Sequence, residues 1–147
     1  MFKHILVPMD GSQLSQDAAK KAVSIAKETG ARITAFYAKQ PASEIYWDKL
    51  AWVTLPEPSK LAESAEQEAK RVLSYIEDLC REAGVSYAGQ SVTCDTVYEG
   101  IIAAANQSGC DLIFMASHGR RGINALLLGS ETNKVLTHSK IPVLVYR

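Results

Sequence analysis

Residues 111–119 read DLIFMASHG, and this stretch decides the fold class. The segment 111–116 is apolar at every position from Leu112 to Ala116, so a strand formed here has two buried faces. A strand that helices cover on both sides is typical of the centre of a parallel sheet. The polar sequence Ser117-His118-Gly119 then predicts a turn directly after the strand.

Short apolar runs and helical patterns alternate outward from this strand. Strands are predicted over 4–9, 33–38, 91–94, 111–116 and 141–146. Helices are predicted from Ser12 to Gly30, from about Ser59 to Gly84, from Val97 to Ser108 and from about Ser130. Residues 39–58 hold three prolines without a sustained period and are predicted to form a surface segment. Because helices separate the strands, we expect one α/β domain over 1–147, with helices on both faces of a doubly wound parallel sheet.

Charge and apolar content limit the classes of function. The chain has 147 residues, with 16 Lys and Arg against 16 Asp and Glu, which argues against a nucleic-acid binder. No apolar run approaches the ~20 residues of a membrane-spanning helix. Pro8 and Asp10 follow the short run over 5–7, unlike the core of a signal peptide. The three cysteines form no C-x-x-C pair, so we expect a reducing, cytoplasmic location. Because the apolar runs are short, we expect no membrane partner.

Two glycine-bearing corners are candidates for binding an anion. Gly119 follows the central strand, and a glycine lets the backbone approach a phosphate closely. Gly129-Ser130 stands at a predicted helix start, where unpaired N–H groups and the helix dipole favour an anion. Residues 111–147 hold five basic against two acidic side chains. A turn glycine followed by a helix cap would have the same spacing. The chain contains no Walker sequence that would identify a phosphate site. The spacing therefore leaves open both a phosphate site and a purely structural role.

Three pieces of the chain together resemble the universal stress protein family. Its nucleotide-binding members carry G-x2-G-x9-G-[S/T], and this chain has Ala116-Ser-His-Gly119, nine residues and Gly129-Ser130. Pro8-x-Asp10-Gly11-Ser12 and Lys140-Ile-Pro142 also match, so the resemblance runs from Lys3 to Arg147. It implies a Rossmann-like sheet in strand order 3-2-1-4-5, in which strands one and four end side by side.

The resemblance further implies a stress-response protein that binds ATP, or AMP or ADP, together with Mg²⁺ at those two strand ends. The residues that it places around the nucleotide are Pro8, Met9, Asp10, Ala38, Met115, Ala116, His118, Gly119, Arg120, Gly129, Ser130, Glu131 and Thr132. Asp10 would face the ribose and phosphates, the Ala38 backbone would contact adenine, and His118 would lie by the phosphates. Arg121 is close enough in the sequence to contribute positive charge near the phosphates.

The first glycine of the family motif is Ala116 here. If the backbone at this position needs a positive φ, alanine strains it by roughly 1 kcal/mol or more, whereas at a negative φ the added methyl costs little. This departure, together with the apolar run over 126–128, supports an alternative in which the chain is a nucleotide-independent interaction protein.

A slow ATPase is a third hypothesis. Asp10 and His118 are the candidates for a general base, but neither has an orienting partner visible in the sequence, so we assign no catalytic residue. His4 and His138 are expected to be structural or exposed. Cys80 lies on the apolar stripe of its helix and is expected in the core.

The last predicted strand, 141–146, bears on assembly. In the implied order it lies at the edge of the sheet, where its backbone groups would be unpaired. Pairing with its own copy across a two-fold axis satisfies them. We therefore expect a homodimer through this strand, as the family resemblance also implies.

Overall fold

A five-stranded parallel sheet in the order β3-β2-β1-β4-β5 forms the centre of the protein. The structure is a computed structural model and describes residues 1–41, 57–120 and 127–147. The strands are β1 (His4–Pro8), β2 (Arg32–Lys39), β3 (Tyr87–Thr93), β4 (Leu112–Ala116) and β5 (Val143–Tyr146). The predicted strand order and fold class are confirmed.

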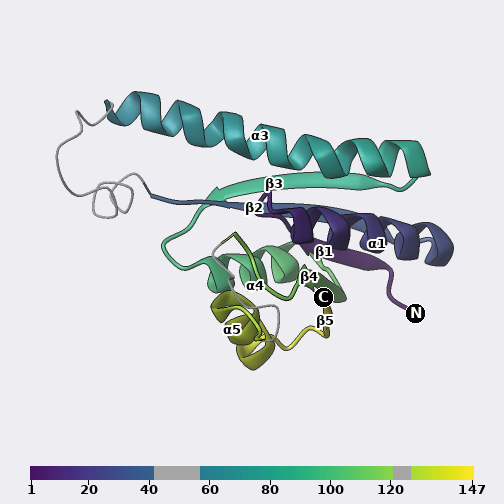
Figure 1. Cartoon of the computed structure of the whole chain (residues 1–147). Helices are drawn as coiled ribbons and strands as arrows, with labels where there is room; N and C mark the ends of the chain where they lie inside the picture. The colour runs from purple at the N-terminus through teal and green to yellow at the C-terminus, as the bar shows by residue number, and fades with distance from the viewer. Residues whose placement is uncertain (42–56, 121–126) are drawn as a thin grey trace.

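Helices cover both faces of this sheet (Figure 1). They are α1 (Gln13–Thr29), α3 (Pro58–Ala83), α4 (Val97–Ser108) and α5 (Ser130–His138). The helices α1 and α3 lie on one face, and α4 and α5 lie on the other. Among the described residues, no helix has the length and apolar character to cross a membrane.

Local capping explains where α1 begins and ends. The Ser12 hydroxyl accepts a hydrogen bond from the Ser15 N–H at 3.2 Å, which satisfies one of the helix's free donors. Gly30 ends the helix with φ +72°, a left-handed conformation that glycine adopts without strain. Both ends therefore lie where the sequence predicts them.

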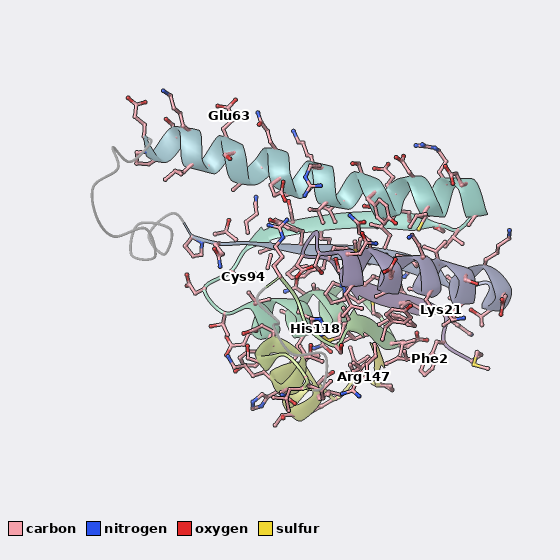
Figure 2. All side chains as sticks on the ribbon, in the orientation of Figure 1. Phe2, Lys21, Glu63, Cys94, His118 and Arg147 are labelled. Carbon is pink, nitrogen blue, oxygen red and sulfur yellow. The ribbon has the colours of Figure 1, made fainter. Side chains whose placement is uncertain are left out.

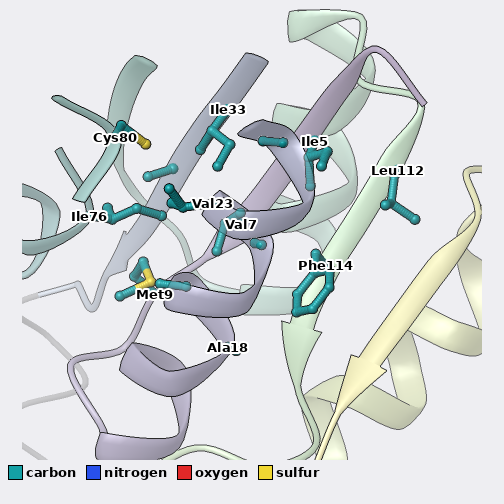
Figure 3. Packing of buried hydrophobic residues seen from close by; sticks show 14 of the residues in the cluster. Ile5, Val7, Met9, Ala18, Val23, Ile33, Ile76, Cys80, Leu112 and Phe114 are labelled. Carbon is teal, nitrogen blue, oxygen red and sulfur yellow. The ribbon is translucent and has the colours of Figure 1, made fainter. Parts of the chain in front are cut away.

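Each face of the sheet carries its own apolar core. Phe114 of β4 packs with Ile5, Val7 and residues of α1 and α3, as Figure 3 shows. Ile113 and Met115, which point to the opposite face, pack with residues of α4 and α5. All five residues of β4 are buried, so the prediction of a central strand is confirmed. Cys80 is fully buried in the first core, and burial raises the pKa of its thiol to about 11.

Two strands begin more than one residue away from the predicted position. The strand β3 begins at Tyr87, four residues before the predicted Ser91. It lies at the sheet edge and mixes half-buried with exposed residues, so no apolar run marks its start in the sequence. The strand β5 begins at Val143 rather than Ile141. Pro142 has no N–H to donate, and its carbonyl accepts from the Ile113 N–H at 2.9 Å just before the strand.

The order of strands creates the switch point of the sheet. The chain leaves β1 for β2 on one side, and later returns to place β4 on the other side of β1. In open α/β sheets, ligands bind beyond the carboxyl ends of the strands at such a point. The turns after β1 and β4 are therefore the region where a functional site is expected.

Candidate functional site

Asp10 joins the turn after β1 to the turn after β4. Its Oδ1 accepts the Ser12 N–H at 2.9 Å, and its Oδ2 accepts the Arg120 N–H at 2.9 Å. A Cβ at Gly119 would collide with this carboxylate, so the close approach of the two turns requires glycine there. The expected meeting of the two strand ends is confirmed, and the group that lies against Gly119 is a carboxylate of the protein itself.

The hydrogen bonds keep the Asp10 carboxylate ionised. Burial by itself raises its pKa, but the bonds from Ser12, Ser15 and the Arg120 N–H outweigh burial and hold the pKa below its ordinary value. A carboxylate with a lowered pKa is a poor proton acceptor near neutral pH. Asp10 is therefore suited to orient N–H and hydroxyl groups rather than to act as a general base.

The start of α5 packs directly on the turn after β4. The Gly129 N–H donates to the Ser117 carbonyl at 2.7 Å, and a Cβ at Gly129 would lie 3.1 Å from the His118 Cα. The two glycine-bearing corners are thus neighbours, as predicted. The Gly129 N–H, which we expected to be free for an anion, is instead paired within the protein.

The first turn of α5 supplies the donors that remain. Gly129 is the N-cap and has no side chain to cap the helix, so the N–H groups of Ser130, Glu131 and Thr132 have no partner within the helix. Ser130 is exposed. Three N–H groups at the positive end of a helix dipole form a site that favours an anion.

The side chains of Glu131 and Thr132 have partners inside the protein. The Thr132 hydroxyl donates to the Ala116 carbonyl at 3.1 Å and is buried. The Glu131 carboxylate accepts the Tyr98 N–H at 2.9 Å and so caps the start of α4. These contacts fix α5 against β4 and α4, which leaves the backbone of the two residues as the part that faces the site.

Ala116 occupies an ordinary strand position. It is the last residue of β4 and pairs with Tyr146 of β5, so its backbone is extended and needs no left-handed conformation. Of the two cases that the sequence left open, the structure corresponds to the one in which the extra methyl costs little. Replacement of the family glycine by alanine therefore does not strain this corner.

The other predicted residues surround the two turns with different degrees of access. Met9 and Met115 are buried at the carboxyl ends of β1 and β4, and their side chains belong to the cores on opposite faces. Pro8, Ala38 and His118 are half-buried. The His118 ring lies near α5 in Figure 2, with its Nδ1 3.1 Å from the Ser117 hydroxyl. The predicted Arg121 and the segment 42–56 lie outside the described residues.

An ion-pair cluster that the sequence did not reveal lies over the turn after β1. Glu68 of α3 accepts Arg120 Nη2 at 2.6 Å and Arg71 Nη2 at 2.7 Å, both through Oε1. These hydrogen bonds, from Arg71 first and then Arg120, lower the pKa of Glu68 to about 2. Gly11, with φ +79°, lies below both guanidinium groups, and a Cβ there would be 2.5 Å from Arg120 Nη2. Nothing in the local pattern marks Glu68, because its partner Arg120 is 52 residues away in the chain.

A hollow of about 260 Å³ opens beside the same cluster, between the start of α1 and α3. Met9, Gly11, Gln16, Arg71, Tyr75 and Asp78 are among its lining residues. Of the residues predicted to surround a ligand, Met9 alone lines this hollow. The cavity is therefore adjacent to the switch point rather than at its centre.

The site offers no preformed metal centre in the parts of the chain that the structure describes. No group of three or more His, Cys, Asp and Glu side chains there is placed to hold a metal ion. Both oxygens of Asp10 already accept N–H groups.

Comparison with known proteins identifies the family to which the chain is similar. The model of the universal stress protein family matches residues 1–147. The universal stress protein MJ0531 of Methanocaldococcus jannaschii is 31% identical over 150 residues, which cover 100% of this chain and 83% of that protein. The solved structure of the hypothetical protein MJ0577, from the same organism, has a TM-score of 0.82 and 27% identity, covering 99% of this chain and 95% of that one.

Solved structures with the same fold include complexes with adenine nucleotides. A universal stress protein in complex with cAMP has a TM-score of 0.73 and 22% identity, covering 99% of this chain and 97% of that one. The Archaeoglobus fulgidus protein in complex with dAMP has a TM-score of 0.70 at 17% identity, with coverage of 99% and 98%. An Arabidopsis thaliana protein with AMP bound has a TM-score of 0.68 at 15% identity, with coverage of 97% and 90%.

Proposed function

Because this chain belongs to the universal stress protein family, we propose that it binds an adenine nucleotide at the carboxyl ends of β1 and β4. The observation that carries the proposal is the junction of the two turns through Asp10 and Gly119, directly beside the uncapped start of α5. The complexes of structurally similar proteins with cAMP, dAMP and AMP support an adenine nucleotide as the ligand.

In this proposal the phosphates bind the first turn of α5. The N–H groups of Ser130, Glu131 and Thr132 and the Ser130 hydroxyl donate to phosphate oxygens, and Gly119 and His118 complete the pocket. The ribose lies by Asp10, whose ionised carboxylate accepts from a ribose hydroxyl. The base lies toward the end of β2, where it contacts the Ala38 backbone and the carboxyl ends of β1 and β4 at Pro8, Met9, Met115 and Ala116.

ATP, carried with Mg²⁺, is the proposed form of the nucleotide. The Mg²⁺ ion would be coordinated by the phosphates and water, as is usual for a cation that loses its water reluctantly. Arg120 supplies positive charge beside the turn. The lowered pKa of the Asp10 carboxyl makes it a poor general base, which favours ATP as a ligand over rapid hydrolysis.

A thermal-shift experiment tests the proposed function. A ligand that binds only the native protein stabilises it by RT ln(1+[L]/Kd), so millimolar MgATP or AMP should raise the melting temperature. Acid extraction of the freshly purified protein should also release an adenine nucleotide. A melting temperature that does not change with any adenine nucleotide at millimolar concentration would contradict the proposal.

The second candidate is a nucleotide-independent interaction protein, and exposed leucines favour it. Leu127 is 68% exposed just before α5, and Leu144 is 39% exposed on β5. Among the described strands, β5 lies at the end of the sheet and pairs with β4 alone, so its other edge is available to a second copy of the chain. We propose a homodimer through β5 in either case. Cys80, Cys94 and Cys110 are free thiols, which suits the proposed cytoplasmic location.

A further inference from the structure

We propose that Glu68 is a built-in competitor for the phosphates of the nucleotide, because it occupies the guanidinium groups of Arg120 and Arg71 beside the site. This inference deepens the nucleotide binding proposed above and rests on it. It makes Glu68 a residue that sets affinity without touching the ligand, and it assigns Arg71 of α3 to the anion-binding surface.

Arg120 connects the nucleotide site with α3. Its backbone N–H is bound to Asp10 at the junction of the two turns, at 2.9 Å. Its side chain reaches α3, where Nη2 is 2.6 Å from Glu68 Oε1. The guanidinium group of Arg120 is thus turned toward a carboxylate of the protein.

The same Glu68 carboxylate holds a second arginine. Arg71 donates from Nη2 to Oε1 at 2.7 Å and from Nε to Oε2 at 2.8 Å, which is a two-point contact. Both guanidinium groups lie over Gly11, since a Cβ there would be 2.5 Å from Arg120 Nη2 and 3.3 Å from Arg71 Nη2. Two positive charges therefore converge on one negative charge above the turn after β1.

A phosphate can replace the Glu68 carboxylate in this arrangement. The planar fork of arginine binds carboxylate and phosphate oxygens with the same geometry. A phosphate group carries up to about two negative charges near pH 7, against one on glutamate. Glu68 and Arg120 are 32% and 50% exposed, and ion pairs that are open to water are weak enough to exchange.

The competition should discriminate between nucleotides. A monophosphate satisfied by the first turn of α5 has little charge left for the arginines. A diphosphate or triphosphate has further oxygens that can reach them, so its affinity should depend more strongly on Glu68. In the native protein, Glu68 would therefore weaken ATP binding more than AMP binding.

The test compares Glu68→Gln with the matched variant Glu63→Gln. Glu63 lies on the same helix and is exposed, and its side chain points away from the sheet in Figure 2, so its neutralisation controls for the general loss of one negative charge. We would measure Kd for AMP, MgATP and inorganic triphosphate by calorimetry. Glu68→Gln should tighten MgATP and triphosphate binding about threefold to tenfold, and Glu63→Gln by less than about twofold.

A double-mutant cycle with Arg120→Ala tests whether Glu68 acts through Arg120. If Glu68 acts through Arg120, then Glu68→Gln should give clearly less gain in the Arg120→Ala background than alone. A Glu68→Gln protein that binds MgATP and triphosphate as the native protein does, or more weakly, would overturn the inference. A gain that Arg120→Ala leaves fully intact would overturn it as well.

The two proposals can fail separately. If no adenine nucleotide binds but triphosphate binding increases in Glu68→Gln and depends on Arg120, the proposed function fails and the anion competition stands. If nucleotides bind and Glu68→Gln has no effect, the proposed function stands and the competition fails. If triphosphate and nucleotides bind none of the variants, both are refuted.

Discussion

Ser130→Pro is the sharpest test of the phosphate site, because it removes one N–H donor with little disturbance of the fold. Ser130 is the first residue of α5, where proline is well tolerated. The preceding Gly129 has φ −61° and ψ 155°, an extended conformation that a following proline requires. Ser130 is also exposed, so the proline ring has room.

The expected loss follows from one hydrogen bond to a charged group. Such a bond contributes about 1.5–3 kcal/mol, and about 1.4 kcal/mol is tenfold in Kd. We therefore expect Ser130→Pro to weaken AMP and MgATP binding about tenfold to a hundredfold. Ser130→Ala removes the hydroxyl and keeps the N–H, so it isolates the contribution of the backbone donor.

Calorimetry with AMP and MgATP would give Kd for both variants and the native protein. The melting temperature without ligand should stay the same or rise slightly, because proline restricts the unfolded chain. If Ser130→Pro binds nucleotide as tightly as Ser130→Ala and is equally stable, the first turn of α5 does not hold the phosphates.

Three further predictions concern stability and assembly. Burial and the nearby Arg32 lower the pKa of His4, so the native state disfavours its protonation, and the free energy of unfolding should fall as the pH drops below about 6.5; urea unfolding at several pH values should show this fall in the native protein and a smaller one in His4→Gln. Gly11→Ala should destabilise more than Gly30→Ala: both residues have a positive φ, which costs alanine about 1–2 kcal/mol, but only at Gly11 would the added Cβ also meet neighbouring side chains. Chemical denaturation of the two variants would measure the difference, and equal losses would contradict it. Leu144→Lys should convert the proposed dimer to a monomer at micromolar concentration, as measured by light scattering, whereas a native protein that is itself monomeric would refute the interface.

Local patterns in the sequence were sufficient for the elements of the sheet and for the general location of the site. The apolar run over 112–116 predicted a strand buried on both faces, since every residue of a strand faces one core or the other. Ser12 and Gly30 predicted the ends of α1, because capping depends on residues next to the helix. The resemblance to universal stress proteins added the strand order, which places the end of strand one beside the end of strand four.

Only the tertiary structure decided which polar groups of the site are free and which are already bound. The Gly129 N–H donates to the Ser117 carbonyl, the Glu131 carboxylate caps α4, and Glu68 pairs with Arg120, which is 52 residues away in the chain. None of these contacts follows from spacing along the chain, because the partner of a polar group is set by the segments that the folded topology brings beside it. Periodicity and capping act within a few residues, whereas the availability of a donor for a ligand depends on contacts between distant elements.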